Sequence, residues 1–150
     1  MKTTELASLF ERDLLKVRTE VLSYTSDSDL WRLTPGISNS AGNLTLHICG
    51  NLRHFIGHVL GGSSYIRERE KEFSQKDLSR EYLAAEIDTT VTEVIPVLKA
   101  LSADRLELEF PKEISGMKQT TGFALLHLFG HLSYHLGQMN YHRRMTSGKG

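Results

Sequence analysis

The sequence contains few of the residues that cross-link a chain or interrupt its secondary structure. It has one cysteine, Cys49, among 150 residues, so no disulfide can form within the chain. Only three prolines and one tryptophan occur. A single cysteine favours a reducing compartment, and we therefore expect a cytoplasmic protein.

Neither the charge nor the apolar runs point to a polyanion or a membrane as the partner. Eighteen basic residues balance 18 acidic residues, whereas proteins that bind nucleic acid or an anionic membrane surface have a basic excess. No apolar run approaches the roughly 20 residues of a membrane-spanning helix, and the first residues lack the apolar core of a signal peptide. We therefore expect a small-molecule ligand, with no nucleic acid and no membrane as partner.

Length and periodicity predict one helical domain over residues 1–150, because a chain of this size suits a single core. Apolar residues recur at three- and four-residue spacings in four stretches, as is typical of amphipathic helices. The predicted helices run from about Thr4 to Tyr24, from Ser40 or Asn43 to Gly61, from Ser79 to Leu101, and from Thr120 or Thr121 to Met145. Four helices with little else indicate an all-α four-helix bundle.

Two connections between these helices are long. Residues 63–78 are rich in Arg and Glu, which predicts a solvated loop. This loop is longer than a tight antiparallel turn requires, which argues against a simple up-down-up-down order. In the second connection, Leu106, Leu108 and Phe110 alternate with glutamates, so a short strand is possible there.

Three histidines, His127, His131 and His135, are four residues apart on the last predicted helix. This spacing places side chains on one helical face, and two such imidazoles can bind one cation. A straight helix cannot aim three successive turns at one ion, so His131 and His135 form the predicted ligand pair. His127 is interpreted as a neighbour of the site or a packed side chain. His58 and His142 are expected on the solvent side or at a helix end.

His47, at a core-facing position of the second predicted helix, is the best candidate for a third ligand. Three neutral imidazoles leave coordination positions open, as in catalytic rather than structural metal sites. An ion held in this way can lower the pKa of a bound water or thiol. Position 132 is Leu, whereas a His-Glu-x-x-His metallopeptidase has glutamate there, so we do not expect such a peptidase. The alternative is that the histidines are structural and hold no metal.

Three further residues are candidates for the surroundings of this site. Asn51, one turn after His47, is interpreted either as a contact of metal-bound water or as a packed amide. Tyr134 and Gln138 adjoin His135, and for Gln138 a structural hydrogen bond is preferred over catalysis. The sequence shows no separate general acid or base, so no catalytic residue is assigned.

Two motifs resemble the DinB-like superfamily. They are Asn43-Leu-Thr-Leu-His47-Ile-Cys-Gly-Asn-Leu-Arg-His54 and His131-Leu-Ser-Tyr-His135-Leu-Gly-Gln138, and the resemblance spans nearly the whole chain. The sequence looks closest to an uncharacterised branch of small bacterial proteins in that group. The resemblance implies a four-helix bundle with up-down-down-up connections, which is consistent with the long second connection.

The resemblance also implies a divalent metal ion, often nickel or zinc, held by three histidines. The first ligand of the family falls on His47, and its His-x3-His pair falls on His131 and His135. Characterised relatives include transferases and isomerases that use bacillithiol, mycothiol or glutathione, and many members are homodimers. We therefore expect a metal-dependent enzyme, a thiol S-transferase or a hydrolase, that acts on a small molecule as a homodimer.

A second hypothesis comes from a different functional class. It is a non-catalytic module of stress-related type that binds a metal or mediates dimerisation. Metal content, together with consumption of a low-molecular-weight thiol, distinguishes the two hypotheses.

Overall fold

A computed structural model describes residues 2–147 of the chain, and helices dominate it. The long helices are α1 (Thr3–Leu22), α3 (Ala41–Leu52) with its π-helical continuation η1 (Arg53–Leu60), α5 (Arg80–Ala100) and α7 (Thr121–Thr146). The short helices are α2 (Asp27–Leu30), α4 (Arg69–Ser74) and α6 (Ala103–Glu107). The described residues form two isolated β-bridges and no strand, which confirms the predicted all-α four-helix bundle. None of the described helices has the length and apolar character of a membrane span.

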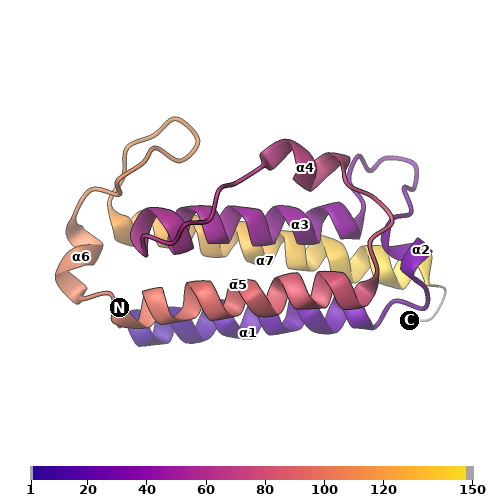
Figure 1. Ribbon diagram of the computed structural model, residues 1–150, viewed down its shortest axis with the longest axis horizontal. Helices are drawn as coiled ribbons and strands as arrows, with labels where there is room; N and C mark the ends of the chain where they lie inside the picture. The colour runs from indigo at the N-terminus through magenta and orange to yellow at the C-terminus, as the bar shows by residue number, and fades with distance from the viewer. Residues whose placement is uncertain (1, 148–150) are drawn as a thin grey trace.

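The helices α1 and α7 run in one direction, and α3–η1 and α5 run in the opposite direction (Figure 1). The start of α1 meets the end of α5, where Thr3 Oγ1 donates a hydrogen bond of 3.0 Å to the carbonyl of Leu101. The ends of α1 and α7 also meet, since Tyr24 Oη lies 2.7 Å from Nδ1 of His142. The predicted up-down-down-up order is therefore confirmed. The chain between η1 and α5 returns along the length of the bundle.

Local sequence determines where the long helices begin. The side chains of Ser40, Ser79 and Thr120 each accept a hydrogen bond from the backbone N–H three residues further on. Such caps satisfy N–H groups that have no partner within the helix. The predicted boundaries therefore lie within two residues of those observed.

The core lies between the four long helices and fixes their spacing. Side chains from each of them are fully buried, including Phe10, Ile48, Ile87 and Leu132. Burial of one such side chain contributes about 1.5–3 kcal/mol. The core therefore holds α3 and α7 as a rigid pair, and the candidate site lies between these two helices.

The first long connection is largely exposed, as predicted, but it is not a solvated loop throughout. It contains α4, which packs on α3, and Glu72 within it is only 5% exposed. A close approach of α4 is possible because Gly50 has no side chain: a Cβ there would lie 2.1 Å from Oε2 of Glu72. The prediction failed for Glu72 because this glutamate has partners inside the fold.

The second long connection forms no strand. Residues 103–107 are helical as α6, and the bridges Glu109–Thr120 and Ile114–Met117 are isolated. Leu106 and Phe110 are buried but Leu108 between them is exposed, so the alternating apolar residues do not form one buried face.

Candidate metal centre

Three histidines from α3 and α7 converge between these helices. Nε2 of His131 lies 3.0 Å from Nε2 of His47 and 3.0 Å from Nε2 of His135. The three nitrogen atoms all lie within 4.8 Å of one another. In a tetrahedral zinc site, with Zn–N distances of about 2.0–2.1 Å, the ligand nitrogens are about 3.3 Å apart. The structure thus brings together the three residues that the sequence predicted as ligands, and this cluster could hold a metal ion.

Glu72 fixes the orientation of His47. Its Oε1 lies 2.9 Å from Nδ1 of His47. Burial alone raises the pKa of Glu72, but the hydrogen bonds from Arg67 and His47 outweigh burial and lower this pKa below its ordinary value. An ionised carboxylate only accepts hydrogen bonds, so Nδ1 of His47 carries the hydrogen and donates it. The lone pair of His47 Nε2 therefore faces the cluster.

Arg67 holds Glu72 in place through a two-pronged ion pair. Its Nε lies 2.8 Å from Oε2, and its Nη2 lies 2.8 Å from Oε1. Sequence reasoning missed both residues because they lie in the segment interpreted as a solvated loop. Gly50 was the available signal, since a glycine inside a helical pattern can have a packing reason such as the close approach of another segment.

Gln138 has the same role for His135. Its Oε1 lies 2.7 Å from Nδ1 of His135, which donates to it, so the preferred structural hydrogen bond is present. The lone pair of His135 Nε2 consequently also faces the cluster. Nε2 of His131 lies between these two acceptors, Nε2 of His47 and Nε2 of His135. It carries at most one hydrogen, so it cannot donate a hydrogen bond to both.

The environment keeps the imidazoles of His131 and His135 uncharged. Burial, followed by the neighbouring imidazoles of His135 and His47, lowers the pKa of His131 to about 3. Burial also lowers the pKa of His135, although its bond to Gln138 acts in the opposite direction. Metal ions bind neutral imidazole, so both side chains are in the form that binding requires at neutral pH.

The remaining candidates lie in different surroundings. His127 is exposed and lies outside the three-histidine group. Asn51 is 8% exposed, and its Oδ1 has no hydrogen-bond partner among the residues that the structure describes. Tyr134 is exposed, with its ring 5.4 Å from that of His135. Their roles in binding a ligand stay predictions. Burial raises the pKa of Cys49 to about 12, so this thiol stays protonated at neutral pH.

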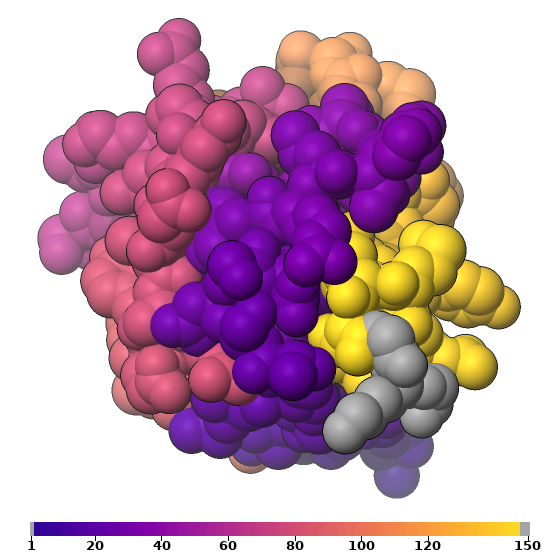
Figure 2. All heavy atoms as spheres, turned by 90° about the vertical axis from the view of Figure 1, so that its right-hand side faces the viewer, coloured from indigo at the N-terminus to yellow at the C-terminus, as the bar shows by residue number. Residues whose placement is uncertain are grey.

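Of the two alternatives for His142, the solvent-side position was wrong, because this side chain is buried near the end of α7. Its Nδ1 lies 2.7 Å from Tyr24 Oη, and its Nε2 donates a hydrogen bond of 2.8 Å to the carbonyl of Arg32. The loop before α3 covers this part of α7, and in Figure 2 that loop (purple) lies beside the C-terminal turns of α7 (yellow). Proximity to the helix end therefore did not mean exposure.

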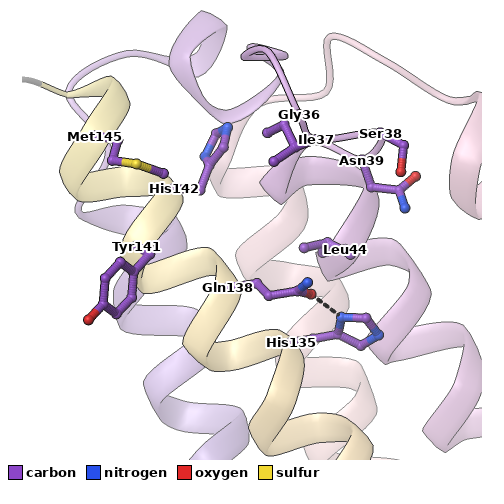
Figure 3. A pocket seen from close by; sticks show the side chains of 10 residues that line it. All are labelled: Gly36, Ile37, Ser38, Asn39, Leu44, His135, Gln138, Tyr141, His142 and Met145. Atoms are coloured by element: carbon purple, nitrogen blue, oxygen red, sulfur yellow. Dashed lines mark hydrogen bonds between the residues drawn. The ribbon is translucent and has the colours of Figure 1, made fainter.

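A cavity of about 340 Å³ adjoins the cluster at His135 (Figure 3). It is lined by Gly36, Ile37, Ser38 and Asn39 of the loop before α3, by Leu44 of α3, and by His135, Gln138, Tyr141, His142 and Met145 of α7. Small-molecule sites have volumes of about 300–1,000 Å³. The cavity is therefore large enough for a small ligand next to one of the three histidines.

Comparisons with known proteins agree with this architecture. The model of the DinB superfamily matches residues 9–139. The fold is similar to that in the crystal structure of a DinB-like protein from Bacillus cereus ATCC 10987, with a TM-score of 0.72 and 17% sequence identity. That similarity covers 93% of this chain and 89% of the other. No match was found among curated proteins.

Proposed function

The chain belongs to the DinB superfamily, and from that premise we propose that it is a metal-dependent enzyme that acts on a small molecule. His47, His131 and His135 hold the divalent ion in this proposal. One observation carries it: three imidazole nitrogens converge within 4.8 Å of one another. Hydrogen bonds at Nδ1 fix the orientation of two of these rings: His47 donates to Glu72, and His135 donates to Gln138.

Hydrogen bonding within the protein does not account for this arrangement. The lone pairs of His47 and His135 both face Nε2 of His131, which supplies at most one hydrogen. A buried acceptor without a partner costs about 1–3 kcal/mol. A cation satisfies all three nitrogens together. We propose zinc or nickel, since imidazole ligands suit both metals.

The chemistry follows from the ligands and from the space beside them. A divalent cation in such a site is a Lewis acid that lowers the pKa of a thiol or water bound to it. Glu72 and Gln138 keep the imidazoles in the required tautomer, and the cavity at His135 admits the second reactant. We therefore favour one of two reactions of a small electrophile. Either a low-molecular-weight thiol is transferred to it through sulfur, or it is hydrolysed. The cavity favours an enzyme over a module that only binds metal, because metal storage requires no ligand pocket.

Metal content is the first test. The protein, purified without a histidine tag and incubated with Zn²⁺ or Ni²⁺, is expected to retain stoichiometric metal by inductively coupled plasma mass spectrometry. His131→Ala should lose this metal. His127→Ala removes an exposed imidazole one turn earlier on the same helix and should retain it. Absence of metal from every preparation, or equal retention by both variants, would exclude the proposed centre.

Turnover is the second test. The metal-loaded protein is incubated with bacillithiol, mycothiol or glutathione and a panel of electrophiles, and the loss of free thiol is measured. Ester and amide substrates test hydrolysis in parallel. Turnover that is lost in His131→Ala supports the enzyme. Stoichiometric metal without turnover on the whole panel supports the non-catalytic metal-binding module instead.

A further inference from the structure

The composition of the lining of the cavity at His135 bears on the class of substrate. Ile37 and Leu44 form one wall, and Tyr141 and Met145 of α7 form the other (Figure 3). The polar side chains among its lining residues include Ser38, Asn39 and Gln138. Of the described residues that line the cavity, none is Lys, Arg, Asp or Glu.

Two polar side chains of the lining are already engaged, in whole or in part, by hydrogen bonds within the protein. His142 uses both ring nitrogens, one with Tyr24 and one with the carbonyl of Arg32. The amide oxygen of Gln138 accepts the hydrogen bond from His135. A carboxylate in this cavity would lose hydration and find no cationic side chain among the described lining residues. An apolar group there instead replaces water against the Ile, Leu and Met side chains.

The cavity is also fixed in shape. The bond from His142 to the carbonyl of Arg32 ties the loop before α3 to α7, and Arg32 Nη1 donates a hydrogen bond of 3.2 Å to the carbonyl of Thr146. The ring of Trp31 packs on Gly42, where an added Cβ would lie 2.7 Å from the indole. The wall that carries Ile37 is thus anchored at several points and is preorganised for a ligand.

We propose that this cavity binds the uncharged, largely apolar body of the substrate, whose reacting group lies at the three-histidine cluster. This inference rests on the proposed function, because the cluster provides the reacting end. It specifies the substrate class as a small neutral molecule with an apolar body. A cosubstrate thiol that carries carboxylates then approaches the cluster from outside this cavity.

The test uses probes that share one metal-binding head and one ring. The probes are 4-methylbenzohydroxamate and 4-carboxybenzohydroxamate, titrated into the Zn²⁺-loaded protein by isothermal titration calorimetry. The methyl probe is expected to bind about tenfold more tightly or better, because the carboxylate is desolvated without a partner. Equal binding, or tighter binding of the carboxylate probe, would overturn the proposal.

A pair of matched variants tests the location. Ile37→Arg places a cation in the cavity wall and should reduce the preference for the methyl probe by about tenfold or more. Ile66→Arg makes the same change at an isoleucine that is 82% exposed and outside this cavity, and it should leave the preference unchanged. An unchanged preference in Ile37→Arg would overturn the assignment to this cavity.

A separate measurement distinguishes failure of the cavity from failure of the metal centre. If the protein binds neither Zn²⁺ nor Ni²⁺, the proposed function fails, and the metal-free protein is then titrated with 4-methylphenol and with 4-hydroxybenzoate. Shifts of the backbone amide resonances of Ile37, Leu44 and Met145 with 4-methylphenol alone would support the cavity assignment. Equal shifts with both probes, or none with 4-methylphenol, would overturn it.

Discussion

Nδ1 of His47 lies 2.9 Å from Oε1 of Glu72, a buried carboxylate 25 residues further along the chain. Glu72 is itself held by two hydrogen bonds from Arg67. A carboxylate behind a ligating histidine fixes the tautomer and increases the basicity of the nitrogen that faces the metal. The segment with α4 therefore belongs to the candidate centre although it contributes no ligand.

Removal of this carboxylate should weaken metal binding without unfolding the protein. Glu72→Gln keeps the size of the side chain and removes its charge, so we expect the affinity for Zn²⁺ to fall about 10–100-fold. The affinity is measured by competition with a chelator of known strength. Glu70→Gln makes the same change at an exposed position of α4 and should have no effect. Equal affinities for the two variants would contradict the role of Glu72.

Gly50 makes the close approach of Glu72 possible. In Gly50→Ala the new Cβ would lie 2.1 Å from Oε2, so Glu72 must move and both stability and Zn²⁺ affinity should decrease. Gly57 lies in the same continuous helix, but there the nearest atom is 3.6 Å from an added Cβ. Gly57→Ala should therefore be neutral or stabilise by up to about 1 kcal/mol. Urea denaturation measures stability, and a Gly50→Ala variant as stable as Gly57→Ala would refute this steric account.

Much of the helical fold could be predicted from the sequence because its signals are local. The caps Ser40, Ser79 and Thr120 and the apolar periodicity lie within the helices that they define. The strand considered from Leu106 to Phe110 did not form: its first residues are helical as part of α6, and Leu108 is exposed instead of lying on a buried face.

The candidate site could be predicted only in part. The spacing of His131 and His135 is a property of one helix, and the third histidine followed from its core-facing position on another. The partners of Glu72 depend instead on how a long connection folds back onto α3. The spacing of apolar residues in the sequence does not indicate how this connection folds. The hydrophilic composition of this connection predicted that Glu72 is exposed. Its ion pair with Arg67 and its hydrogen bond with His47 permit Glu72 to be buried.

The outer face of α7 provides a test of self-association. Phe123, Leu126 and Tyr134 lie on this face, and each is at least half exposed. Apolar surfaces of this kind often mark protein interfaces, and we propose that two copies of the chain associate through it. Leu126→Glu should therefore shift the sedimentation coefficient from that of a dimer to that of a monomer, whereas Ile66→Glu, at an exposed site elsewhere, should not. A wild-type protein that sediments as a monomer at all concentrations would contradict the proposal.

The pKa of His131 predicts how the stability of the metal-free protein depends on pH. Burial and the neighbouring imidazoles lower this pKa to about 3 in the folded protein, from an ordinary value of 6.5. Between these values the unfolded chain binds more protons than the folded protein, so the free energy of unfolding falls as the pH falls from about 6.5 toward 3. One such group contributes at most about 1.4 kcal/mol per pH unit.

Urea denaturation in the presence of EDTA, between about pH 7 and pH 4.5, measures this dependence. His131→Asn removes the group with the lowered pKa, so its stability should fall less steeply with decreasing pH than that of the wild type. His127→Asn removes an exposed imidazole from the same helix and should leave the wild-type slope unchanged. Identical slopes for the wild type and His131→Asn would show that His131 is not held uncharged in the folded protein. The three imidazoles would then not all be in the neutral form that metal binding requires.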